Sequence, residues 1–81
     1  MNKRHILFHL KEAREAIEQL ASDLERAADY GFDEYRVDMQ HVYHHLNTAW
    51  NGRDADEARA TASAHQDFDA WRQFPKDLEI W

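Results

Sequence analysis

Six histidines make imidazole chemistry the first question raised by this 81-residue sequence. Imidazoles bind divalent metals, transfer protons and change charge close to neutral pH. Two pairs are spaced four residues apart, His5 with His9 and His41 with His45. On a helix this spacing places both rings on one face, as a shared metal ion requires.

The second pair suggests a metal site if the helices pack antiparallel. We predict no cofactor. The expected register places His65 level with His41, so the alternative is a site for a divalent metal such as zinc, with His41, His45 and His65 as ligands. Asp38, one turn before His41, would add a carboxylate. Two alternatives stay open: the histidines are ordinary surface residues, or they respond to pH.

A row of glutamates raises the question of catalysis. Glu12, Glu15 and Glu18 step by three residues, a spacing used by helical nucleotide pyrophosphatases to hold magnesium. Such sites need carboxylates that point inward from two helices, whereas these glutamates fall opposite the apolar stripe. No cysteine, glycine-rich elbow or phosphate-binding loop is present. We therefore predict no catalytic residue and keep a small metal-dependent hydrolase as an alternative.

The elements that carry these residues are predicted to be helices throughout. Apolar residues recur at helical spacing, and the chain has only two glycines and one proline. We predict a first helix over about residues 2–30, closed by Gly31 in the left-handed conformation. A second helix, capped by Asp33, should end near Gly52, and a third should run over residues 55–74 until Pro75.

Short connections between helices force antiparallel neighbours. The predicted fold is therefore all-α: an antiparallel up-down-up three-helix bundle over residues 1–75 with a long first helix, followed by a C-terminal tail over residues 76–81.

The unequal helix lengths lead to a prediction about function. A shorter second helix would leave the start of the first one bare, and exposed apolar patches usually mark interfaces. We predict a non-enzymatic protein-interaction module that self-associates through helix one as a homodimer. Coverage by the loop after Trp50, or contact of residues 3–11 with a membrane surface, are the alternatives. The predicted interface consists of Ile6, Leu7, Phe8, Leu10, Leu78, Ile80 and Trp81.

Composition narrows the range of partners. The net charge is −6, with 16 acidic and 10 basic residues, so we expect no nucleic acid partner. No apolar run approaches the roughly 20 residues of a membrane span. Without a cysteine or a recognisable signal peptide, the expected location is cytoplasmic. The partner is expected to be a second copy or another protein.

Overall fold

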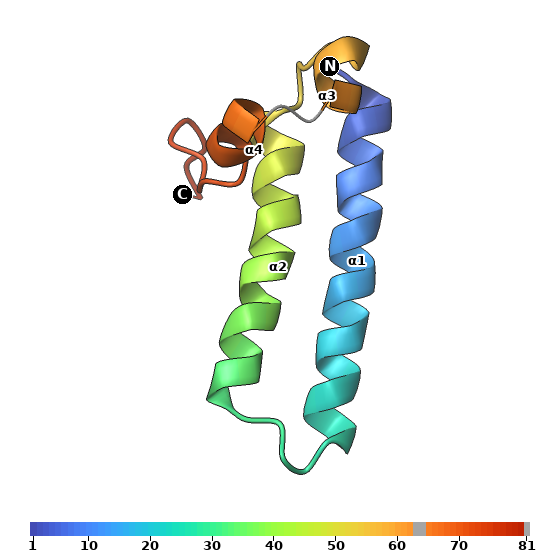
Figure 1. Cartoon of the computed structure of the whole chain (residues 1–81), viewed down its shortest axis with the longest axis vertical. Coiled ribbons are helices and arrows are strands. Elements are labelled where there is room, and N and C mark those ends of the chain that lie inside the picture. Colours follow the sequence, from blue (N-terminus) through green and yellow to red (C-terminus); the bar gives the residue numbers. More distant parts are fainter. Residues whose placement is uncertain (63–64, 81) are drawn as a thin grey trace.

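The computed structural model describes the backbone of residues 1–62 and 65–80 and the side chains of residues 1–61 and 67–80. The described residues form four helices: α1 (Lys3–Arg26), α2 (Phe32–Asn51), α3 (Glu57–Ala62) and α4 (His65–Trp71). The prediction of an all-helical protein is confirmed. The finer prediction of a three-helix bundle is not, because two short helices occupy the segment expected to form the third long one (Figure 1).

A long antiparallel hairpin of α1 and α2 dominates the structure (Figure 1). Asn2 caps α1 by accepting a hydrogen bond from the backbone N–H of His5, which satisfies one of the free donors of the first turn. The side chains buried between the helices are mainly small, among them Ala13, Val42 and Ala49. The described part of the chain contains no large side chain that is fully buried. The core is therefore thin, as expected at this chain length.

The turn between the two helices differs from the predicted one. Helix α1 ends at Arg26, and its last turn is closed by the N–H of Ala27, which donates to the carbonyl of Asp23. Gly31 does not close α1. It is the N-cap of α2 in an extended conformation, and its N–H donates to the Glu34 carboxylate. Gly31, and not Asp33, therefore opens the second helix.

The predicted overhang of helix one is wrong. The N–H of Asn2 donates to the carbonyl of Arg53, and its side-chain amide donates to the carbonyl of Ala55. The first turn of α1 is thus level with the last turn of α2, and its His5 is buried beside Trp71. Because α1 stops at Arg26, before the predicted end, the two helices are close in length and α2 reaches the start of α1.

The third segment folds back over this end of the hairpin. In Figure 1, α3 lies across the start of α1, and α4 lies beside the end of α2. Two asparagines of α2 hold the end of α4 through backbone carbonyls at and just after its last residue: Asn47 donates to Arg72, and Asn51 donates to Trp71 and Gln73. These amides replace the partners that the last carbonyls of a helix lack.

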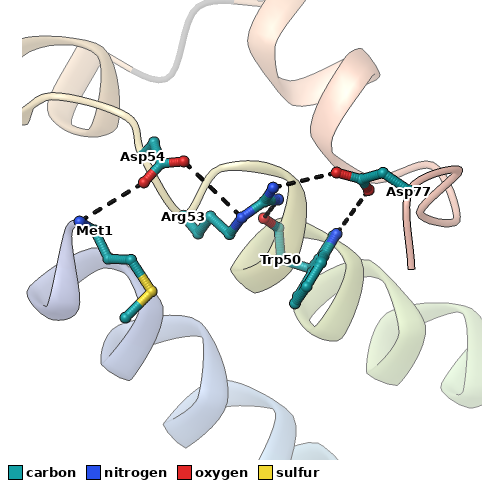
Figure 2. Close-up of polar contacts among 5 residues, drawn as sticks. All are labelled: Met1, Trp50, Arg53, Asp54 and Asp77. Carbon is teal, nitrogen blue, oxygen red and sulfur yellow. Dashed lines mark hydrogen bonds and ion pairs between the residues drawn. The ribbon is translucent and has the colours of Figure 1, made fainter. Parts of the chain in front are cut away.

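Polar contacts fasten both ends of the chain to the turn after α2 (Figure 2). Arg53 lies between two carboxylates, 3.9 Å from Asp54 and 3.2 Å from Asp77. Asp54 is 3.7 Å from the N-terminal amine, and Asp77 accepts a 2.8 Å hydrogen bond from the Trp50 indole. The tail is therefore docked by polar groups, and Leu78 and Ile80 stay exposed.

Candidate functional site

A chain of three imidazoles crosses the interface between α1 and α2. The Nδ1 atoms of His9 and His45 are 3.0 Å apart, and the Nε2 atoms of His45 and His41 are also 3.0 Å apart. His45 is buried, His9 is half-buried and His41 is exposed. Helix geometry explains the arrangement, because His41 and His45 are one turn apart on α2 and His9 faces them from α1.

Two further histidines flank this chain. His5 packs edge-on against both His9 and Trp71, and His44 lies beside His45 and Phe68. One ring nitrogen of each flanking histidine, Nε2 of His5 and Nδ1 of His44, is buried without a hydrogen-bond partner among the described residues. Five of the six histidines thus gather at the end of the hairpin that carries the N-terminus.

Burial and crowding lower the pKa of four of these imidazoles. Burial, followed by repulsion from the neighbouring imidazoles, lowers the pKa of both His9 and His45 to about 4. Burial also lowers the pKa of His5, against the opposing attraction of Glu57, and the pKa of His44. At neutral pH, these four imidazoles are therefore uncharged.

The hydrogen bonds along this chain of imidazoles must all run in the same direction. A neutral imidazole has one N–H donor and one acceptor nitrogen. If His45 donates to His9, it must accept from His41; if it accepts from His9, it must donate to His41. The arrangement can relay a proton between the exposed His41 and the half-buried His9 without charging the buried ring.

A cavity of about 380 Å³ adjoins the cluster on the side covered by α3 and α4. Three histidines of the cluster, His5, His9 and His44, contribute to its wall together with Phe8 and Trp71. Glu57 also lines the cavity and attracts His5, but among the described side chains no hydrogen bond joins a carboxylate or hydroxyl of the cavity to an imidazole. The geometry therefore offers proton exchange and lone pairs but no activated nucleophile.

The predicted metal site is brought together only in part. His41 and His45 are adjacent, whereas the side chain of His65 lies outside the described residues. Within the described ranges, no group of three or more histidine or acidic side chains is arranged to hold a metal ion. Metal binding therefore stays a prediction, with two of its three ligands in contact.

The glutamates of the hydrolase alternative do not point inward. Glu15 and Glu18 are exposed, and only Glu12 is half-buried. Glu12 and Glu15 line a surface hollow with Asp38 and His41, and Glu18 is not part of it. This geometry gives the hydrolase alternative no support, because no three acidic or histidine side chains among the described residues are arranged to hold a metal ion.

The predicted interface residues are spread over several surfaces. Leu7, Phe8 and Leu10 are between 45% and 56% exposed, but Phe8 lines the histidine cavity. Ile6 is half-buried. In the tail, Leu78 and Ile80 are exposed, and Trp81 lies outside the described residues. The apolar side chains at the start of α1 are thus exposed although α2 lies beside this part of the helix. They are not exposed because α2 is too short to reach them, as predicted.

Leu10 also belongs to a longer apolar stripe that runs along one side of α1. Leu10, Ile17 and Leu24 are spaced by seven residues, about two helical turns, and are 45%, 47% and 55% exposed. On α2, Tyr35 and Leu46 are 37% and 38% exposed and eleven residues apart, about three turns.

Both stripes lie on one face of the hairpin. On each helix, the exposed stripe is rotated from the buried stripe by roughly a fifth of a turn about the helix axis, in the sense in which the helix winds. Because α1 and α2 are antiparallel, the same sense of rotation leads to the same face. We call this surface the apolar face; it consists of Leu10, Ile17, Leu24, Tyr35, Met39 and Leu46.

Sequence reasoning missed the contribution of α1 to the histidine cluster. The spacing of His5 and His9 marked them as a pair on one face, but the predicted register placed them beyond the end of helix two. A register two turns shorter would have placed His9 opposite His45. The missing signal was the true end of α1 at Arg26.

Comparison with known proteins gives no relative. No protein-family model matches the chain, and no curated protein and no solved structure is significantly similar to it. Within the described residues, no helix is long and apolar enough to cross a membrane.

Proposed function

We propose that this protein is a non-enzymatic interaction module that self-associates through the apolar face of its helical hairpin. The observation that supports this proposal is the alignment of exposed Leu, Ile and Tyr side chains from both helices on one face. A monomer rarely leaves such a continuous apolar surface in water, and surfaces of this kind usually mark protein interfaces.

The total surface of the chain supports the same proposal. The chain exposes 6363 Å², whereas a compact monomer of 9.7 kDa exposes about 5,100 Å². The excess of roughly 1,200 Å² is more than the roughly 800 Å² that each partner buries in a standard interface. The radius of gyration of 14.2 Å also exceeds the roughly 12 Å typical of a compact domain of this length.

The proposal keeps Leu10 from the predicted interface and moves the centre of the interface along α1. Phe8 is left out, because it lies on the opposite side with the histidine cavity. Leu78 and Ile80 lie outside the apolar face and are not required for association.

Sedimentation velocity on an Ile17→Glu variant tests the proposal. We expect the parent chain to sediment as a species larger than its 9.7 kDa monomer at micromolar concentration. A buried, unpaired carboxylate in each copy should weaken association by roughly 100-fold. Val37→Glu is the matched control, because Val37 is 56% exposed on the opposite face of α2. A monomeric parent, or equal effects of both variants, would contradict the proposal.

We propose metal binding by His41, His45 and His65 as a second candidate function. It is supported by the 3.0 Å separation of the Nε2 atoms of His41 and His45. Two nitrogen ligands of one tetrahedral zinc ion would be about 3.3 Å apart, so a small rotation of either ring suffices. The third ligand in this proposal is His65, to which Asp38 would add a carboxylate.

Calorimetric titration with zinc chloride tests the second candidate. We expect micromolar binding that is lost when His41 and His45 are both replaced by alanine. A His5→Ala variant, which removes a histidine outside the proposed set, is the control. Binding weaker than micromolar in the parent chain, or binding unchanged in the double variant, would remove this candidate.

A further inference from the structure

The charges along α1 are divided between its two halves. Residues 3–14 carry four basic side chains and one acidic one, whereas residues 15–26 carry four acidic side chains and one basic one. This order opposes the helix dipole, which favours acids near the N-terminus and bases near the C-terminus. The arrangement therefore gives no benefit to α1 as an isolated helix.

Several of these charges have no ion-pair partner in the part of the chain that the structure describes. Among the described residues, neither Lys11 nor Arg14 in the basic half forms an ion pair, and neither Glu18 nor Glu25 in the acidic half does so. By helical rotation, these four residues lie along the outer edge of the apolar face of α1. They would border any partner that docks there.

We infer that two copies of this chain pair through the apolar face with α1 antiparallel to α1 of the partner, so that Ile17 lies at the two-fold axis. The inference rests on the proposed self-association and adds its orientation and register. About this axis, Leu10 meets the partner's Leu24, seven residues to either side of Ile17. The basic half of each α1 then faces the acidic half of the other.

Charge decides between the two ways in which the faces can meet about a two-fold axis. In the alternative, α1 packs antiparallel on α2 of the partner. Its acidic half would then oppose the first half of α2, residues 32–41, which has three acidic side chains and one basic one. Like charges opposite one another destabilise an interface, so pairing α1 with α1 is favoured.

The second helix fits the same axis. Residues 42–51 of α2 carry no acidic, lysine or arginine side chain, so an antiparallel α2 pair places an acidic half against an uncharged one. Met39 is close to level with Ile17, because His9 lies opposite His45 and each step along α1 is a step back along α2. Met39 would therefore lie near the axis. Leu46 would meet the partner's Phe32, which is 72% exposed and lies seven residues before Met39, at the border of the apolar face.

Disulfide cross-linking of single-cysteine variants tests the inference directly, because the chain has no native cysteine. A disulfide needs Cβ atoms about 4 Å apart. Under mild oxidation, we expect Ile17→Cys and Met39→Cys each to cross-link to its own copy. Leu10→Cys should not, because its two copies would be about 21 Å apart, but it should cross-link when mixed with Leu24→Cys. Val37→Cys, on the opposite face, is the control.

The possible outcomes separate this inference from the proposed function. A cross-link that forms only in a mixture of Ile17→Cys and Met39→Cys would show that α1 packs on the partner's α2. Efficient self-cross-linking of Leu10→Cys would show a parallel pair. Either result overturns the inference while self-association stands. A parent chain that sediments as a monomer would remove the proposed function itself.

Discussion

His9 and His45 are 36 residues apart in the sequence, yet their Nδ1 atoms meet at 3.0 Å across the hairpin. Neither ring can take up a proton without breaking this hydrogen bond or placing a charge beside its neighbour. Protonation of these two rings is therefore less favourable in the folded chain than in the unfolded chain, where the rings are in water. This difference links the stability of the hairpin to pH.

We expect acid to destabilise the protein between pH 6.5 and pH 4. The folded pKa of His9 and of His45 is about 4, below the ordinary histidine value of 6.5. As the pH falls through this window, the unfolded state binds more protons, so the free energy of unfolding decreases. Allowing for solvent at the half-buried His9, the loss is on the order of 2 kcal/mol. Thermal melts followed by circular dichroism across this range measure it.

The double variant His9→Leu, His45→Leu distinguishes the contribution of these histidines to acid destabilisation from that of the carboxylates, which also titrate in acid. Its melting temperature should change less between pH 6.5 and pH 4 than that of the parent chain. If parent and variant lose stability in parallel, the acid response comes from other groups and not from the imidazole pair.

Replacing Gly52 by alanine should destabilise the fold by about 1–3 kcal/mol through overpacking. An added Cβ would lie 2.7 Å from Nε2 of His5, 3.1 Å from the carbonyl oxygen of Thr48 and 3.1 Å from the Trp71 ring. At least one of these groups must move, and the contact between α1 and α4 passes through this point. Urea unfolding, followed by tryptophan fluorescence, measures the change.

Gly31→Ala is the matched control for this substitution. Its added Cβ would meet only a Glu34 oxygen at 3.4 Å, an ordinary contact, and its backbone is extended. We expect a change within about 0.5 kcal/mol, because alanine also restricts the unfolded chain. Equal losses in the two variants would show that close packing at Gly52 is not the cause.

Replacing Asp77 by asparagine should release the tail without unfolding the hairpin. Asp77 accepts a hydrogen bond from the Trp50 indole and pairs with Arg53 (Figure 2). Its side chain is 60% exposed, so the loss of stability should be small. We expect a change in Trp50 fluorescence, assigned by comparison with Trp50→Phe. Glu79→Gln, in the same tail, is the control and should leave the emission unchanged.

The second helix was predicted within one residue, over residues 33–51 against the observed Phe32–Asn51. Its helical apolar spacing and the glycine at each end are local signals, and local signals fix where helices occur. The turn before it was not predicted, because a glycine between two helices is compatible with ending the first or starting the second. In the structure, Glu34 accepts from the Gly31 N–H and so assigns this glycine to α2.

The third segment shows why helical propensity alone does not predict a long helix. Between residues 57 and 65 the sequence has no apolar side chain larger than alanine. Such a segment has little apolar surface to bury, so packing along the hairpin would stabilise a longer helix only weakly. Phe68 and Trp71 anchor it to the end of the hairpin instead, where Asn47 and Asn51 bind the carbonyls of Arg72 and Trp71.

The sequence by itself determined that the chain is helical, where the second helix lies and that two histidine pairs each share a helical face. These properties follow from spacing and capping within one element. The tertiary structure decided the register of α1 on α2, and with it the contact of His9 with His45 and the common side of the two apolar stripes. Register depends on where a turn begins and on how small side chains fit between two helices, which no single helix encodes.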